Sequence, residues 1–375
     1  MESLTSLRQR VKAKGIPYYS SLSRLDLESF LSEEEYSLGW RWKYIKPVLM
    51  NKLDARFAVQ MLISPVRKYS KIRNKSSIRK LKYFLNNHPV VVTMTTSPIR
   101  LPKITAVLAM LDIEYITQIN VVLPMQYGAK NEVYNNIPED LLNFPKVKIV
   151  RIEKDMGPIT KMLPVIKDSS DRKAIVISID DDIGYPMGMI KELIYQKVIK
   201  HPKAVITMGT SMGFYGGIKN MKKYWPERHQ KRPFVDLVEG WSSILYMPNL
   251  VNTECMSEIA NLSRKCLLSD DFVISFVLAL SKVEKVIVNN RYAFNPHPFT
   301  YGTGEDALHA GRDLGEGKKK YIANDDTINF EKYSACLENI VEYVKLVKQG
   351  KKRNVCKIKR NQLTNISGKP ARKST

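Results

Sequence analysis

Short runs rich in β-branched residues alternate with stretches of helical periodicity between residues 90 and 290, and this alternation constrains the fold more than any other feature. The predicted strands are 90–96, 119–123, 147–152, 174–180, 204–208 and 285–290. The predicted helices are 101–111, 159–166, 187–200 and 271–280. Such alternation is typical of an α/β sheet with mostly parallel strands, which binds ligands at the carboxyl ends of its strands.

One predicted strand, 174–180, runs directly into three consecutive acids, Asp180, Asp181 and Asp182. Side chains at positions i and i+2 of an extended segment point the same way, so Asp180 and Asp182 can share one hard cation through oxygen ligands. A divalent metal bridging to a diphosphate would offset the repulsion among three adjacent carboxylates. The pattern therefore predicts a Mn²⁺ or Mg²⁺ site, with a solvated acidic turn as the alternative.

With this acidic motif at a strand end, the chain resembles nucleotide-sugar glycosyltransferases of the glycosyltransferase-A fold, family-2-like, from about Val90 to Cys336. The resemblance implies the α/β architecture of the nucleotide-diphospho-sugar transferases, a Rossmann-like mixed sheet flanked by helices. It also implies that Asp180 and Asp182 bind the metal and that Asp180 and Asp181 contact the donor. His297 would be a third metal ligand, because imidazole suits manganese beside carboxylates; His309 is the reserve.

Two segments before the acids fit the same family. The stretch Thr95–Arg100 ends the first predicted strand, and the resemblance places Thr95 and Arg100 against the base and diphosphate of the donor. A planar guanidinium pairs well with phosphate oxygens. The segment from Asp155 to Lys161 resembles an Asp-x-Gly-Pro-x-x-Lys motif. The resemblance implies that Asp155 contacts the donor, and Lys161 could reach a donor phosphate or pair with the acids.

Two segments after the acids complete the resemblance. Glu239 would accept hydrogen bonds from sugar hydroxyls, Gly240 would allow close backbone approach, and Trp241 would offer a flat apolar face or be a core residue. The acids Asp270 and Asp271 open a predicted helix, where carboxylates are favoured, with Ser269 as its N-cap. The family implies Asp271 as the general base of an inverting displacement, with Asp270 as its helper; simple helix-capping acids are the alternative.

The net charge of +23 is concentrated on two flanks, because residues 36–82 carry 13 basic and one acidic side chain and residues 345–375 carry 11 basic and none acidic. We call these two segments the basic arms. Basic arms of this kind bind an anionic membrane surface or nucleic acid; the alternative is that they only keep the protein soluble. The N-terminal 31 residues have a helix–extended–helix pattern, with a predicted capping box from Ser23 to Asp26, and resemble SAP-like modules of nucleic-acid proteins. The predicted organisation is a SAP-like segment, a basic helical linker, a catalytic domain and a basic tail, at residues 1–35, 36–88, 89–344 and 345–375.

The four cysteines, Cys255, Cys266, Cys336 and Cys356, form no CxxC pair, and this scatter predicts free thiols in a reducing compartment. We find neither a secretory signal nor an apolar run of about 18 residues. The expectation is therefore a cytoplasmic enzyme, membrane-peripheral through its basic arms.

The predicted activity is transfer of a sugar from a nucleotide-sugar donor to a glycan, lipid or protein acceptor. One alternative is a nucleic-acid-binding protein that uses the basic arms and the SAP-like segment. Another is a sugar nucleotidyltransferase, which would need a glycine-rich loop after the first strand, whereas residues 95–100 contain no glycine. A catalytically inactive sugar-binding relative is the last alternative.

Overall fold

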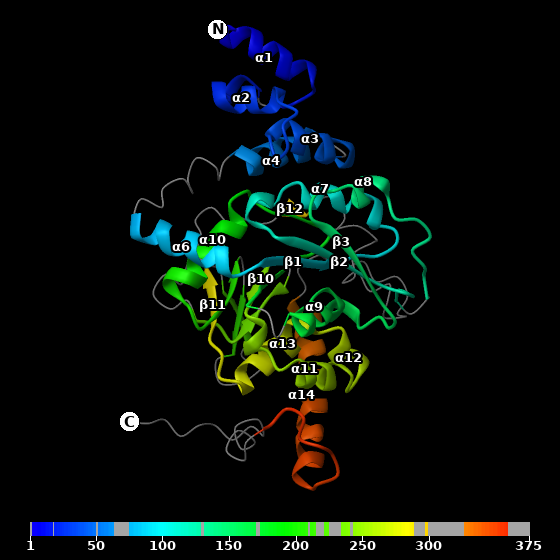
Figure 1. Cartoon of the computed structure of the whole chain (residues 1–375). Helices are drawn as coiled ribbons and strands as arrows, with labels where there is room; N and C mark the ends of the chain where they lie inside the picture. Colours follow the sequence, from blue (N-terminus) through cyan, green and yellow to red (C-terminus); the bar gives the residue numbers. More distant parts are fainter. Residues whose placement is uncertain are drawn as a thin grey trace.

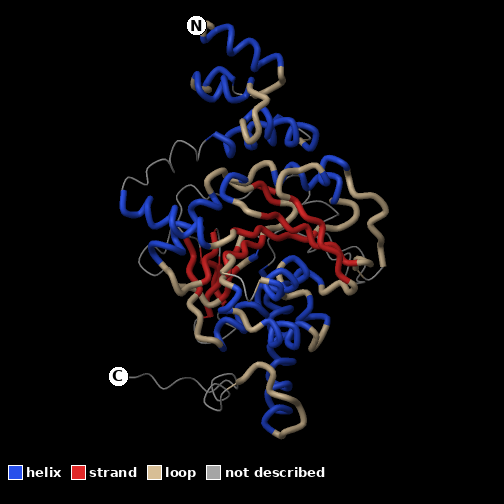
Figure 2. Tube along the Cα trace, viewed as in Figure 1, coloured by secondary structure: helices blue, strands red, loops and turns tan. Residues whose placement is uncertain are grey.

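The computed structural model has a central α/β unit, with a helical N-terminal extension on one side and a long C-terminal helix on the other (Figure 1). It describes residues 2–17, 19–49, 52–63, 75–128, 131–169, 173–208, 211–214, 221–224, 234–240, 243–288, 297–298 and 326–358. Strands lie in the middle of the α/β unit, with helices on both sides of them (Figure 2).

The middle layer is a seven-stranded sheet, within the described residues, in the order β11-β6-β10-β4-β1-β2-β3. Its strands are β1 (Val90–Thr95), β2 (Gln118–Pro124), β3 (Val147–Ile152), β4 (Ile175–Ser178), β6 (Val205–Met208), β10 (Ile244–Tyr246) and β11 (Lys285–Val288). Neighbouring strands pair in parallel except β10, which is antiparallel to both β4 and β6. The predicted α/β class, a mixed sheet flanked by helices, is confirmed.

Two small sheets stand beside the large one. One pairs β5 (Ile183–Gly184) with β12 (His297–Pro298), and the other joins β7 (Ser211–Phe214) to β8 (Met221–Tyr224) and β9 (Leu237–Val238). Because β5 begins directly after Asp182, its pairing with β12 brings the 297–298 backbone next to the acidic turn.

The helices follow the predicted pattern of the α/β unit and extend it at both ends. The α-helices are α1 (Leu4–Ala13), α2 (Arg24–Leu31), α3 (Leu38–Ile45), α4 (Lys52–Ile63), α6 (Lys75–Asn87), α7 (Ile104–Leu108), α8 (Glu139–Leu142), α9 (Leu163–Asp168), α10 (Met189–Tyr195), α11 (Thr253–Ala260), α12 (Arg264–Leu267), α13 (Asp270–Leu280) and α14 (Asp326–Lys348). Shorter turns are η1 (Tyr19–Ser21), η2 (Lys46–Val48), η3 (Leu101–Lys103), η4 (Ile113–Tyr115), η5 (Gly157–Lys161), the π-helical η6 (Gln196–Lys200) and η10 (Pro248–Leu250).

The alternation of side chains along the strands divides the interior into two apolar cores. On β1, Val90, Val92 and Met94 belong to the core that also includes α7 and α10, whereas Val91 belongs to the core of α9, α11, α13 and α14. Successive strand residues point to opposite faces, so one continuous apolar run supplies both cores. The helices that carry the candidate site therefore lie on one face of the sheet.

The N-terminal helices are joined to the α/β unit through α3. Arg41 is 1% exposed, and its Nη1 donates to the carbonyl oxygens of Leu111 and of Ala109, the latter at 2.8 Å. Burial lowers the pKa of Arg41, and the charge of Glu114, with Nη2–Oε2 at 3.4 Å, opposes that shift. Ahead of α3, the predicted capping box of Ser23 is confirmed at the start of α2.

The cysteine prediction is wrong, because the fold pairs all four cysteines in disulfides. Cys255 on α11 bonds Cys356, and Cys266 on α12 bonds Cys336 on α14. The partners are separated by 101 and 70 residues in sequence, so no local spacing motif announces them. Tertiary packing of α14 and the chain after it against α11 and α12 brings them together.

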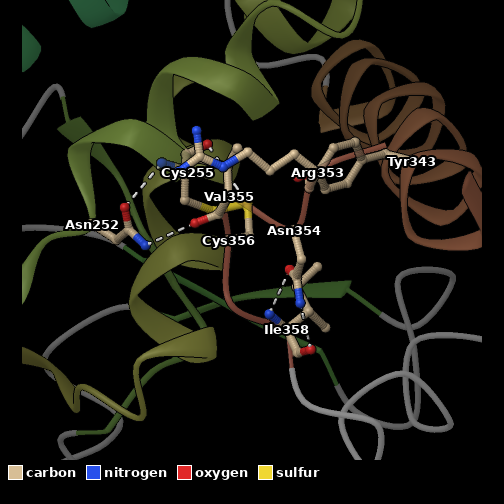
Figure 3. Close-up of a disulfide and its surroundings, with 8 residues drawn as sticks. All are labelled: Asn252, Cys255, Tyr343, Arg353, Asn354, Val355, Cys356 and Ile358. Carbon is tan, nitrogen blue, oxygen red and sulfur yellow. Dashed lines mark hydrogen bonds between the residues drawn. A yellow bond between two sulfur atoms is a disulfide. The ribbon is translucent and has the colours of Figure 1, made fainter. Parts of the chain in front are cut away.

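The chain beyond α14 folds back onto α11 at the first of these disulfides (Figure 3). Asn252 Nδ2 donates to the carbonyl oxygen of Val355 at 3.5 Å, beside the Cys255–Cys356 bond. Asn354 closes the turn by accepting from the Ile358 amide at 2.9 Å. These contacts fix the last described residues onto the face of the sheet that carries the candidate site.

None of the helices in the described parts of the chain combines the length and the apolar character needed to cross a bilayer.

Candidate functional site

The middle acid of the strand-end triplet is directed back toward the end of β1. Arg100 Nη1 lies 2.8 Å from Asp181 Oδ1, and the Thr96 hydroxyl donates to Asp181 Oδ2 at 2.6 Å. Burial raises the pKa of Asp181, and Arg100 and Thr96 oppose that shift. The predicted donor-binding segment Thr95–Arg100 and the acidic turn are thus brought together. Arg100 thus pairs with the acids of the turn, and its predicted contact with the donor diphosphate stays a prediction.

Lys161 joins the strand-end acids to the acids that open α13. Its Nζ lies 2.7 Å from Asp180 Oδ1 and 3.1 Å from Asp270 Oδ2, and the residue is 5% exposed. Burial alone would lower the pKa of Lys161, but the charges of Asp180, Asp270 and Asp271 outweigh it, so this pKa lies well above its ordinary value. One ammonium therefore holds two carboxylates that are 90 residues apart in sequence.

Asp271 accepts a hydrogen bond from the backbone of Gly240, in the predicted sugar-binding segment. The Gly240 amide donates to Asp271 Oδ1 at 2.6 Å. A Cβ placed on residue 240 would lie 2.9 Å from that oxygen and 2.9 Å from Lys161 Nζ, so a larger residue here would displace one of these two side chains. Burial, with the charges of Asp270 and Glu239, raises the pKa of Asp271 well above the usual range despite Lys161.

The third acid, Asp182, carries negative charge that its surroundings only partly balance. Burial first, and then the charge of Asp181, raises the pKa of Asp182 to about 7. Arg100 Nη1 opposes this from 3.4 Å. The side chains of Asp182 and Asp180 are 15% and 26% exposed, so both keep some access to solvent. Carboxylate oxygens are ligands that suit Mg²⁺ or Mn²⁺, so the residue types of Asp180 and Asp182 fit the predicted metal, while Lys161 and Arg100 are their partners in this structure.

The third predicted metal ligand is placed only by its backbone. His297 on β12 pairs antiparallel with Gly184 on β5, two residues after Asp182, while its side chain lies outside the described residues. Among the side chains that are described, no group of three or more His, Cys, Asp or Glu residues is arranged to hold a metal ion. Trp241 and His309 also fall outside the described residues.

Two residues that are predicted to contact the donor form hydrogen bonds with neighbouring backbone. Asp155 accepts from the amides of Gly128 and Gly157, each at 2.8 Å, and so ties η5 to the loop after β2. The Thr95 hydroxyl donates to the Val122 carbonyl at 2.8 Å, on the adjacent strand. Thr96, one residue further on, is the threonine that reaches the acids.

Several residues of the site were missed from the sequence. The buried Tyr185 hydroxyl accepts from the Asp180 amide at 2.8 Å, and it follows the acids closely enough that the Tyr-Pro turn could have suggested it. Lys332 and Tyr333 come from α14. Tyr333 begins the segment Tyr333–Cys336, which resembles the closing segment of the glycosyltransferase-A family, whereas Lys332 lies just before it. Ser269 occupies the predicted N-cap position of α13, but its hydroxyl donates to the Lys265 carbonyl at 2.7 Å and does not cap the helix.

The chain matches no protein-family profile and no curated protein sequence. Among solved structures it is similar to GalNAc-T7 crystallised with UDP, GalNAc and Mn²⁺, with a TM-score of 0.35 and 10% sequence identity. The match covers 70% of this chain and 58% of GalNAc-T7, so the chain spans less than two thirds of that protein.

Proposed function

We propose that this chain is a metal-dependent glycosyltransferase that moves a sugar from a nucleotide-diphosphate donor to an acceptor hydroxyl. The observation that carries the proposal is the position of the Lys161 ammonium, between Asp180 at the end of the central strands and Asp270 at the start of α13. A metal-binding acid and a base-bearing helix must adjoin one reacting carbon in such an enzyme. This contact joins the two elements that the reaction requires.

We assign the strand-end acids to the cation and the donor diphosphate. Asp180 and Asp182 would hold Mn²⁺ or Mg²⁺, with His297 completing the set. When bound, the cation supplies positive charge to a departing diphosphate. Asp181 has a different role, because its contacts with Arg100 and Thr96 fix the turn on which the other two acids stand.

We assign the base to Asp271 on α13. A general base works best when its pKa lies near the working pH, and burial raises the pKa of Asp271 in that direction. The Gly240 amide orients the carboxylate. The adjacent Glu239 would accept hydrogen bonds from sugar hydroxyls. One base and one leaving group give a single displacement, which inverts the anomeric carbon. The acceptor would be a glycan, a lipid or a protein.

We also propose that the enzyme works in an oxidising compartment and not in the predicted cytoplasm. Disulfides persist in secreted, periplasmic and lumenal proteins and are rare in reducing cytosol. Two disulfides link α14 and the chain after it to α12 and α11, and their presence favours an oxidising compartment.

A screen of sugar nucleotides by thermal unfolding, with and without Mn²⁺, tests the proposed function. A ligand that binds only the folded state raises the unfolding temperature, and we expect at least one sugar nucleotide to do so only with the metal. Asp182→Asn should abolish this metal-dependent shift, whereas Asp140→Asn, at an exposed carboxylate on α8, should keep it. A screen in which no sugar nucleotide stabilises the protein, with or without Mn²⁺, would contradict the proposal.

A further inference from the structure

Helix α6 packs against the α/β unit through one of its faces. Its Leu81 is 7% exposed and belongs to the apolar core, while Phe84 and Leu85 pack against that core from half-buried positions. At the end of the helix, the His88 ring stacks on Phe84 with centroids 3.9 Å apart. These contacts fix the rotation of α6 about its axis, so the residues on its other face point away from the protein (Figure 1).

The outward face of α6 combines cations with large apolar side chains. Ile78 and Tyr83 are 45% and 73% exposed, and Arg79 and Lys82 are exposed beside them. Residues four apart on a helix are neighbours, so Ile78 lies next to Lys82 and Arg79 lies next to Tyr83. These four residues form one continuous surface, which we call the α6 stripe.

The positive charge of the α6 stripe is not neutralised by the elements around it. Helix α6 contains four basic side chains and no acid, and η6, which packs against it, ends in the exposed Lys200 and also contains no acid. Neither Arg79 nor Lys82 forms an ion pair with another described residue. A surface with uncompensated positive charge is complementary to an anionic partner.

The two exposed apolar side chains distinguish between the possible anionic partners. A helix that lies in a membrane interface places its cations at the level of anionic headgroups and inserts apolar side chains between the lipids. Nucleic acid would pair its phosphates with the cations but would leave Ile78 without a contact. A second copy of the chain would need about 800 Å² of surface from each partner, which two apolar side chains do not supply, and it would bring like charges together.

We propose that the α6 stripe binds an anionic lipid bilayer, with Arg79 and Lys82 at the headgroups and Ile78 and Tyr83 inserted between the lipids. Two residues separate α6 from the amino end of β1, whereas the candidate site lies at the carboxyl ends of the strands. The six residues of β1 span about 20 Å, so the bilayer and the acids lie at opposite ends of this strand. Binding to the bilayer is therefore independent of the proposed sugar transfer.

Co-sedimentation of the full chain with lipid vesicles tests the proposal. The wild type should bind vesicles that contain phosphatidylserine in phosphatidylcholine and should not bind vesicles of phosphatidylcholine alone. Each cation near an anionic bilayer strengthens binding about five-fold, so Arg79→Gln combined with Lys82→Gln should weaken binding about 25-fold. Ile78→Ser combined with Tyr83→Ser keeps every charge and should weaken binding by about 10-fold or more, because the apolar contact with the lipids is lost.

The matched control is Lys148→Gln combined with Lys167→Gln, which removes the same charge from exposed positions on β3 and α9 and should leave binding close to that of the wild type. A control that loses as much binding as the variant of Arg79 and Lys82 would overturn the proposal, because net charge alone would then drive the binding. Wild-type binding by the variant of Ile78 and Tyr83 would also overturn it, because the apolar side chains would then have no contact with the lipids. All the substituted side chains are exposed, so the variants should unfold at the wild-type temperature, which circular dichroism checks.

Two further measurements on the same proteins identify another occupant of the α6 stripe. Failure of the wild type to bind phosphatidylserine vesicles would overturn the proposal. If the wild type then binds an oligonucleotide and the variant of Arg79 and Lys82 does not, the stripe is a nucleic-acid surface. If the wild type instead self-associates in sedimentation velocity and the variant of Ile78 and Tyr83 does not, the stripe is an interface between two copies of the chain.

Discussion

Asp112 gives a prediction about stability whose size can be worked from the structure. This side chain is 2% exposed and accepts hydrogen bonds at the start of α10 from the amides of Gly188 and, at 3.3 Å, of Lys191. Burial first, and then the charge of Glu114, raises its pKa to about 6 from 3.8, against the opposing effect of the two amides and Arg41. The folded state therefore binds a proton at Asp112 more tightly than the unfolded chain does.

The sign and the magnitude follow from linkage. Because the folded-state pKa is raised, the stabilisation from protonated Asp112 is fully present below about pH 4 and is lost as the pH rises through about 6. A shift of about two units at about 1.4 kcal/mol each corresponds to about 3 kcal/mol in total, of which about 2 kcal/mol falls between pH 4.5 and 7.5. Other buried acids titrate in the same range, so the wild-type curve alone cannot isolate this contribution.

The assay compares wild type with Asp112→Asn by urea denaturation followed by circular dichroism at several pH values. The amide stays neutral throughout and keeps an acceptor for the Gly188 amide, so the variant lacks the titration but retains one hydrogen bond. We expect the free energy of unfolding of the wild type to fall, relative to the variant, by about 2 kcal/mol between pH 4.5 and 7.5. A difference between the two proteins that stays constant with pH would refute the reasoning.

Two further predictions concern the site and the disulfides. Gly240→Ala should lower the transfer rate and destabilise the fold by about 1–3 kcal/mol, because its Cβ would lie 2.9 Å from both Asp271 Oδ1 and Lys161 Nζ. A transfer rate equal to that of the wild type in steady-state kinetics would contradict this prediction, since the two side chains would then have moved aside at no cost. We expect the variant with serine at both Cys266 and Cys336, and the variant with serine at both Cys255 and Cys356, each to lose about 2–5 kcal/mol of stability. Only the Cys266–Cys336 variant should also lower kcat. Equal activity of the two variants, measured well below their unfolding temperatures, would contradict a role for α14 in the site.

The strands of the large sheet other than β10 could be predicted because each is a short run rich in β-branched residues. β1 and β4 begin and end within two residues of their predicted limits. β10 was missed because its three residues, Ile244–Tyr246, are too short to show a period, and its antiparallel insertion between β4 and β6 depends on tertiary packing. The disulfides were missed for the related reason that their spacing is set by the fold.

The sequence singles out residues of the candidate site that follow strands or open helices, and it gives no sign of contacts that a distant element supplies. Asp180, Lys161 and Asp270 stand in motifs, and the structure brings them into contact. Arg100 was predicted at the right place but pairs with Asp181, because a buried carboxylate in the same turn needs a counter-charge and the sequence cannot show that it is buried. Lys332 lies on a helix far along the chain, so only the folded structure shows its hydrogen bond to Leu268, two residues before Asp270.

Single-turnover sugar transfer by Asp271→Asn, in enzyme saturated with Mn²⁺ and donor, tests most directly whether the strand-end acids and α13 form one catalytic site. Donor binding, followed by thermal shift on the same samples, should stay close to wild type, because the variant leaves Asp180 and Asp182 intact. The transfer rate should fall by about 10²–10⁴-fold, the usual contribution of a general base. Transfer at the wild-type rate would contradict the account, because the base would then have to lie elsewhere.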